Sequence, residues 1–345
     1  MAPGTRSDTT IGNPANLPTT PGGGAMTVQI DGRRPENLQW RWRGDRPPIA
    51  TVEPGSIVEI EVPDSSGSQL TEQATRAELA SMDLTRVDPA VGPIDVQGAS
   101  PGDAIVVELL DVQPGRWGWS GIFRDFGLLK DRFDPDLVVW KLQDGWATPR
   151  SGFLRELRLP LHPMLGVIAA APATGEFPMI PPERFGGNMD NRLQRPGSLI
   201  ELPVMRPGGG LSLGDPHALQ GDGEVCGTGI ETSAHVRFRV DVRPGRAPAF
   251  PRIEGTEEAT PAREFLSATG IGPDLHAAAS AAVESLLDRL VEFGWSPEEG
   301  YLLTSLVGSL RIAEIVDEPN FVVSAVFPTE VAALARGTRR AVGRS

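Results

Sequence analysis

Short apolar segments separated by proline and glycine turns recur along the chain, and this spacing limits the folds that it can adopt. The 345 residues include 40 glycines and 33 prolines. The clearest segment, residues 236–242, alternates strictly, with Val236 and Phe238 on one face and Arg237 and Arg239 on the other. A period of two is typical of a strand buried on one face. Many such strands between turns predict a β-sandwich or barrel.

Five further segments predict strands because each is apolar or alternating. Two of them follow a clear turn signal, Pro54-Gly55 in one case and Pro101-Gly102 in the other. These predicted strands cover residues 27–30, 57–62, 104–112, 199–204 and 320–327.

The C-terminal part of the chain carries a helical pattern instead. Apolar residues repeat there at steps of three and four, at Leu275, Ala279, Ala282, Leu286 and Leu290. Pro273 suits the first position of this helix, and Gly294 suits its end. The capping box that begins at Ser296 opens a second helix, which we expect to run to about Glu314. We expect the residues after 329 to form a peripheral helix or a frayed end. Residues 74–82 are expected to form a short helix.

The predicted fold class is therefore mostly β (α+β), a large β-sandwich or barrel-like core with C-terminal helices packed on it. Residues 1–26 are rich in Gly, Pro, Thr and Ser and contain almost nothing to bury, which predicts a disordered tail. We see no internal repeat and no long linker in residues 27–345, so we expect a single catalytic domain there.

Composition excludes several classes of protein. The formal net charge of −13 argues against nucleic acid as a partner. Only one cysteine, Cys226, is present, so no intramolecular disulfide can form. There is no run of eighteen apolar residues and no leader pattern at the N-terminus, which predicts a cytoplasmic protein with no membrane partner.

Residues 186–231 concentrate the polar groups that carry chemistry. Asn188 and Asp190 lie in a first cluster, and the second contains Asp215, His217, Gln220, Asp222 and Glu224. Carboxylates and an imidazole beside many glycines are what a divalent cation needs. Alternation in an extended chain would place Asp215 and His217 on one face, and Gln220, Asp222 and Glu224 together on another. Pro216 indicates a strand end or loop for the first pair. The competing interpretation is a glycine-rich hairpin with solvated acids.

The segments GGNMD and GD-x-HA-x-QGDGEVCGT-x-IE resemble the acetamidase/formamidase family of amide hydrolases. The similarity continues in GPIDVQGASPGDAIVVELLDV, WGWSGI, FGLL, TGIGPDL and RIAEIVDEPN, in family order, over residues 47–328. The resemblance implies a mostly β enzyme that hydrolyses small linear amides to carboxylate and ammonia with a bound divalent metal. Together with the apolar C-terminal segments it also implies a homo-oligomer.

On this basis we assign Asp190, Asp215 and His217 as metal ligands, with Zn²⁺ as the expected ion. Zinc can lower the pKa of water from about 15.7 to about 7 and polarise a carbonyl. Glu224 is the expected general acid/base, with Asp222 as second choice or additional ligand.

Three further residues are assigned to substrate binding. Asn188 and Gln220 could donate hydrogen bonds to the carbonyl oxygen or hold the amide. Trp119 could form a wall of a small-amide pocket, although core packing is the more common role of a tryptophan. The polar segment of residues 64–69 could also line the pocket, or could simply form a turn that enters a helix.

Two alternatives to a metal-dependent amidase stay open. A Cys226-dependent amidase would use Cys226 with Glu224 and either Lys130 or Lys141. The argument against this alternative is that the context of Cys226 favours a small buried apolar residue over a nucleophile.

The other alternative is an amide-binding protein, or a divergent hydrolase that acts on a larger amide. The family usually has histidine where this chain has Gln39, and aspartate where it has Arg43. Arg43 could then favour an acidic group on the substrate.

Overall fold

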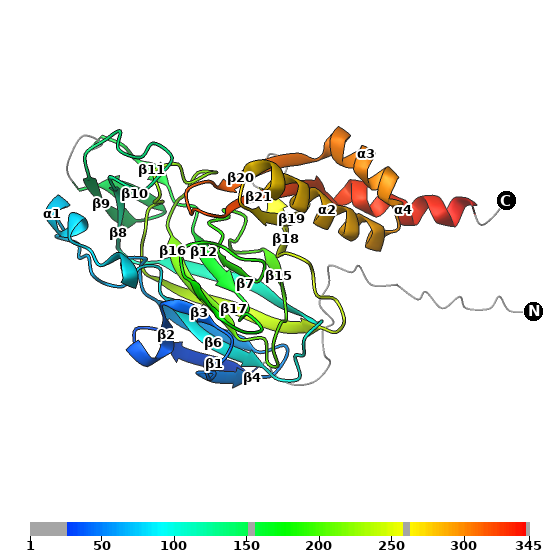
Figure 1. Ribbon diagram of the computed structural model, residues 1–345, viewed down its shortest axis with the longest axis horizontal. Coiled ribbons are helices and arrows are strands. Elements are labelled where there is room, and N and C mark those ends of the chain that lie inside the picture. Colours follow the sequence, from blue (N-terminus) through cyan, green and yellow to red (C-terminus); the bar gives the residue numbers. More distant parts are fainter. Residues whose placement is uncertain (1–25, 151–155, 258–262, 343–345) are drawn as a thin grey trace, which may run out of the picture.

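The computed structural model describes residues 26–150, 156–257 and 263–342 (Figure 1). The predicted tail lies outside these ranges apart from Met26.

A nine-stranded sheet forms one layer of the molecule. All its neighbouring strands run antiparallel except β1 and β5, which are parallel. The predicted strand of residues 57–62 is present with the same bounds, and the other predicted strands differ by one or two residues at their ends. The strand order is β1 (Thr27–Asp31), β5 (Ile57–Val62), β17 (Ala234–Arg243), β7 (Ala104–Pro114), β15 (Leu199–Pro203), β18 (Arg252–Glu257), β19 (Arg263–Gly272), β21 (Phe321–Pro328) and β20 (Ser309–Glu314).

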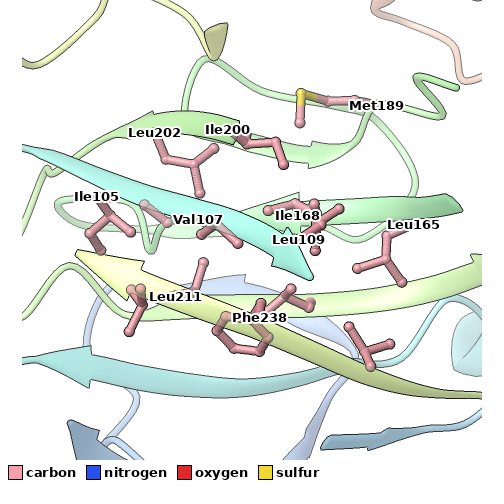
Figure 2. Packing of buried hydrophobic residues seen from close by; sticks show 14 of the residues in the cluster. Ile105, Val107, Leu109, Leu165, Ile168, Met189, Ile200, Leu202, Leu211 and Phe238 are labelled. Carbon is pink, nitrogen blue, oxygen red and sulfur yellow. The ribbon is translucent and has the colours of Figure 1, made fainter. Parts of the chain in front are cut away.

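A six-stranded sheet forms the opposing layer. It contains β14 (Gly186–Asn188), β12 (Met164–Ala169), β16 (Leu211–His217), β6 (Ala90–Val96), β2 (Leu38–Gln39) and β4 (Ala50–Val52). Figure 2 shows the core between the layers, where Val107 and Phe238 of the first sheet lie near Leu165, Ile168 and Leu211 of the second. The apolar face of the alternating strand 234–243 is buried here, as expected. The mostly β fold class is confirmed.

A four-stranded sheet lies at one end of the molecule (Figure 1). It consists of β8 (Trp117–Ile122), β9 (Asp136–Gln143), β10 (Trp146–Pro149) and β11 (Leu159–Pro160). The helix α1 (Arg76–Ala80) contacts β9, and the 3₁₀ turn Leu84–Arg86 follows α1. A two-stranded sheet pairs β3 (Arg41–Arg43) with β13 (Glu176–Pro178), and a further 3₁₀ turn spans Pro35–Asn37.

Three helices gather at the other end, α2 (Leu275–Phe293), α3 (Pro297–Val307) and α4 (Thr329–Val342). The apolar stripe of α2 packs on β19 and β21. Gly294 ends α2 in the left-handed conformation, and the capping box at Ser296 is present. Pro273 lies outside α2, because Asp274 caps the helix. None of the helices in the described ranges has the length and apolar character that a membrane crossing needs.

The predicted end of the second helix at Glu314 is wrong. The helix ends at Val307, Gly308 takes an extended conformation, and residues 309–314 form β20, the edge strand of the sheet, against β21. Pairing with β21 satisfies the backbone of this segment, and this tertiary contact overrides the helical pattern.

Candidate functional site

The polar end of a cavity of about 350 Å³ collects the acidic residues of the central motif. Among the described residues that line the cavity, His217 carries the only imidazole. The Nε2 atom of His217 lies 2.9 Å from Glu231 Oε2 and 3.1 Å from Asp215 Oδ2. Asp190 Oδ1 lies 3.8 Å from the same nitrogen, and Glu224 Oε1 lies 4.0 Å from Nδ1. All five side chains are buried, with at most 7 % of each residue exposed. A histidine surrounded by four carboxylates therefore forms the floor of the cavity.

The strand β16 places two of these residues side by side. It ends at His217, and the side chains of Asp215 and His217 meet, with Asp215 Oδ2 3.1 Å from His217 Nε2. The φ of 51° at Asp215 departs from the extended backbone that simple alternation assumes. Pro216 lies opposite Leu165 of β12, one residue from the strand end. The expectation that Pro216 marks a strand end is confirmed.

Gln220 fixes the orientation of the His217 ring. Its Oε1 lies 2.7 Å from His217 Nδ1, and its Nε2 donates to the backbone oxygen of Asp190 at 2.6 Å. Because Oε1 of an amide can only accept, Nδ1 carries a proton and Nε2 faces the carboxylates. Gln220 is not among the residues that line the cavity, so it acts on His217 and Asp190 rather than on a ligand.

The two aspartates converge over a residue without a side chain. A Cβ built on Gly166 would collide with Asp215 Oδ2 and Asp190 Oδ1, both well inside 3.0 Å. Asp190, Asp215 and Glu224 all have positive φ, at 41°, 51° and 43°. Such strained backbone is uncommon outside glycine and collects at functional sites, where the surrounding structure enforces it.

Burial and crowding shift the pKa values of this cluster. Burial is the main cause that raises the pKa of Asp190 and of Glu224 well above the usual range, and neighbouring carboxylates add to it. Burial also raises the pKa of Glu231 to about 7, against the opposing charge of His217. Burial would lower the pKa of His217, but the charges of Asp215 and Glu231 outweigh it and raise that pKa well above its usual value. The cluster therefore contains more carboxyl groups than one imidazolium can balance, and the raised pKa values mean that several of these groups tend to keep their protons.

This donor set fits a divalent cation. Asp190, His217 and Glu224 offer ligand atoms within 4.8 Å of one another, and so do Asp215, His217 and Glu231. The Oδ1 atoms of Asp190 and Asp215 are buried without a hydrogen-bond partner among the described residues. Orphaned buried carboxylate oxygens are costly, and a bound cation is one way to satisfy them. Oxygen and imidazole ligands suit Zn²⁺ as well as harder ions.

Two of the predicted substrate-binding residues line the cavity, Asn188 and Trp119. Asn188 Nδ2 donates to Asp317 Oδ2 at 2.8 Å, and its buried Oδ1 has no hydrogen-bond partner among the described residues. Trp119 Nε1 donates to Asp64 Oδ1 at 3.2 Å, so the indole contributes ring surface rather than a donor. Trp119 also packs on Leu79, and the core-packing role thus applies together with the wall.

Asp222 does not join the cluster. It is exposed, lies outside the cavity lining, and pairs through Oδ2 with Arg311 Nη2 at 2.8 Å. The shared face expected for Gln220, Asp222 and Glu224 is wrong, because no strand forms between β16 and β17 (Ala234–Arg243). Gly223 and Glu224 have φ values of 88° and 43°, and this turn sends Glu224 inward and leaves Asp222 at the surface.

Three other sequence expectations also need correction. Cys226 is exposed rather than buried, and it lies outside the cavity lining. Arg43 is exposed on β3 and pairs with Asp45 at 2.9 Å, so it is not placed to meet a substrate in this cavity. Gln39 is buried, donates to Ser212 Oγ of β16 at 2.7 Å and does not line the cavity, so it is not placed to meet a substrate there.

Sequence reasoning assigned no role to three residues of the site, Glu231, Asp88 and Asp317, and left the role of Ser65 open. Glu231 ends the segment of residues 186–231 and accepts hydrogen bonds from Ser65 Oγ at 2.8 Å and from the backbone of Gly229 at 2.6 Å. Ser65 belongs to the polar segment 64–69, for which a pocket-lining role was one of two interpretations. Asp88 and Asp317 also line the cavity. Asp317 lies within RIAEIVDEPN, which could have drawn attention to it, whereas Asp88 has no local signal.

Comparisons with known proteins agree with this architecture. The model of the Acetamidase/Formamidase family matches residues 29–177 and 174–333. The formamidase of Methylophilus methylotrophus is 27 % identical over 363 residues, covering 84 % of this chain and 88 % of that protein. The solved structure of an acetamidase from Bacillus halodurans shares 30 % identity with a TM-score of 0.79, and covers 88 % of this chain and 98 % of its own. An acetamidase structure from Yersinia enterocolitica has 28 % identity, a TM-score of 0.81 and coverages of 90 % and 94 %.

Proposed function

This chain belongs to the acetamidase/formamidase family, and from that premise we propose that it is an amidohydrolase. The reaction cleaves the C–N bond of a small linear amide to a carboxylate and ammonia. The observation that carries the proposal is the buried floor of the cavity, where His217 and four carboxylates meet. Amide hydrolysis needs an activated water, a stabilised oxyanion and a proton for the leaving nitrogen, and this set of groups can provide for each.

The second part of the proposal is a resident divalent metal, with Zn²⁺ as the expected ion. Asp190, Asp215 and His217 would hold it, and Glu231 is positioned to add a fourth donor. A divalent cation there supplies Lewis-acid charge that polarises the amide carbonyl and makes water more acidic. Gln220 supports the site by keeping a proton on His217 Nδ1, which leaves Nε2 free as a ligand.

Glu224 is the residue proposed to move the proton. Its carboxylate is buried beside His217, and its pKa is raised by burial first and then by Asp190. A carboxylate of raised basicity can take a proton from the attacking water and deliver it to the leaving nitrogen. Asp222 fits this role less well, because its carboxylate is engaged by Arg311 outside the cavity.

Asn188 is proposed to bind the nitrogen end of the substrate. One N–H of its Nδ2 is donated to Asp317, and the buried atom with no hydrogen-bond partner among the described residues is the acceptor Oδ1. An acceptor suits the N–H groups of an unsubstituted amide rather than the carbonyl oxygen. This differs from a role as donor to the carbonyl, and it favours primary amides as substrates.

A thiol-dependent reaction is supported less well. Cys226 lies outside the cavity lining, and its Sγ is 3.4 Å from the backbone oxygen of Thr228. Lys130 pairs with Glu318 at 2.8 Å on the surface, and Lys141 is an exposed residue of β9. The Cys–Glu–Lys arrangement of such amidases is therefore not assembled in the described part of the chain.

The test is ammonia release from a panel of amides, measured with elemental analysis of the same protein preparation. We expect turnover of primary amides that stops on chelation and returns with Zn²⁺ or a similar ion. His217→Ala should lose metal and activity together, because a ligand lost from a small site rarely leaves it intact. Full activity of the metal-free protein would refute the metal requirement. Absence of turnover with every amide would refute the proposed function.

A further inference from the structure

The cavity has two chemically different ends. Its buried end consists of His217 and the carboxylates around it. The remainder of its lining includes the apolar side chains of Leu79, Met82, Leu84, Val87, Phe123 and Phe126. Leu84 is 57 % exposed, and Met82, Val87, Phe123 and Phe126 are half-buried. His217 and the buried carboxylates therefore form the deep end. The apolar side chains form much of the entrance, together with the exposed Arg124 and Asp125.

Contacts within the fold hold the apolar wall in place. The helix α1 begins with a capping box between Thr75 and Glu78, which fixes its direction. Leu79 of this helix is buried against Trp119, in a cluster that Met82 and Phe123 also join. Gly121 makes room for the contact, because a Cβ there would lie 3.2 Å from Leu79 Cδ1.

The size of the cavity exceeds what the smallest amides need. A volume of about 350 Å³ corresponds to roughly twelve non-hydrogen atoms at about 30 Å³ each. Formamide and acetamide would fill only the polar end, and the apolar wall would stay in contact with water. Pockets of this size and lining usually bury an apolar group attached to the polar one.

We infer that the preferred substrates are primary amides with an uncharged apolar acyl chain of about four to seven carbon atoms. This inference rests on the proposed function and specifies its substrate class. The amide enters first and reaches His217, and the acyl chain lies against Leu79, Met82 and Phe126. Acidic substrates are disfavoured, since the deep end carries Asp190, Asp215 and other carboxylates that repel a second negative charge.

The energetic signature follows from burial of the chain. Each methylene that leaves water contributes about a fourfold gain in binding. The apolar chain does not touch the reacting atoms, so it stabilises ground state and transition state alike. The gain should therefore lower KM and leave kcat nearly constant.

The test compares kcat and KM for formamide, acetamide, butanamide and hexanamide with metal-loaded enzyme. We expect kcat/KM to rise by about fourfold per methylene until the acyl chain fills the cavity. The rise should come from a lower KM at nearly constant kcat. The variant Ala80→Trp narrows the entrance from an exposed position at the end of α1, and it should lower the hexanamide-to-acetamide ratio of kcat/KM at least about tenfold. Ala77→Trp is the matched control, because Ala77 is exposed on the same helix but outside the lining.

The outcomes separate this inference from the proposed function. A steady fall in kcat/KM from formamide to hexanamide would overturn the apolar acyl class and leave amide hydrolysis standing. An equal effect of Ala77→Trp and Ala80→Trp on the ratio would overturn the role of the entrance. No ammonia from any amide, by contrast, would refute the proposed function itself.

Discussion

Gly166→Ala should disturb the carboxylate cluster and leave most of the fold intact. Gly166 lies in β12 beneath the point where Asp190 and Asp215 meet. An added Cβ would overlap Oδ1 of Asp190 and Oδ2 of Asp215, and both atoms must move by roughly 1 Å to reach ordinary contact. Gly166 is not among the residues with positive φ, so alanine brings no backbone strain at this position. The substitution therefore acts on the position of two carboxylates.

The expected loss of activity is large, and the loss of stability is modest. A misplacement of about 1 Å at a reacting centre can lower the rate by about 10²-fold. The carboxylates can give way toward the cavity, so we expect the overpacking to destabilise the fold by about 1–3 kcal/mol. Metal content should fall with activity, because the displaced atoms belong to the proposed ligands.

The assay measures kcat/KM for a primary amide, metal per protein and the melting temperature of both variants. Gly221→Ala is the control, because a Cβ there meets nothing within 4 Å and Gly221 belongs to the same loop as Glu224. It should retain activity and metal. If Gly166→Ala kept full activity and full metal content, the convergence of Asp190 and Asp215 would not be the functional centre.

Three further predictions test the proton carrier, the thiol and the electrostatics, and a fourth tests assembly. Glu224→Gln should keep the metal and lower kcat by about 10²–10⁴-fold, whereas Asp222→Asn should keep both the metal and most of kcat. Steady-state kinetics and elemental analysis of the two variants test this. Cys226→Ala should fold and stay active within about twofold, as ammonia release will show, because its thiol is exposed outside the lining. Burial raises the pKa of Glu314 from 4.5 to about 7, so the folded protein keeps a proton that the unfolded chain releases, and stability falls between these pH values. Glu314→Gln should therefore raise the melting temperature more at pH 8 than at pH 4, and an equal shift at both would contradict the buried charge. Sedimentation at micromolar concentration should show a homo-oligomer, since Leu302, Leu306 and Leu310 are 66 %, 77 % and 56 % exposed on α3 and β20, and a monomer alone would refute this.

Local pattern determined most of the secondary structure. The alternation of residues 57–62 and 234–243 is a property of the chain itself, and it produced strands close to the predicted bounds. Asp215 and His217 also meet at the end of β16, although the positive φ of Asp215 departs from simple alternation. The capping box at Ser296 and the stop at Gly294 were equally local signals, because each depends on neighbouring backbone groups.

Only the tertiary structure decided which acids meet. Ser65 and Glu231 are separated by 166 residues, yet they share a hydrogen bond. Asp317 reaches Asn188 across 129 residues. No period in the sequence reports such contacts, because they arise from packing of the two large sheets and the loops between them.

The neighbours Asp222 and Glu224 show the reason most plainly. Both are carboxylates in one glycine-rich segment, two positions apart, and the chain alone treats them alike. Folding brings β20 beside Asp222, and Arg311 of that strand pairs with it at the surface. The turn at Gly223 directs Glu224 inward, where burial and Asp190 change its proton affinity. A carboxylate takes its chemistry from its surroundings, and those surroundings exist only once the chain has folded.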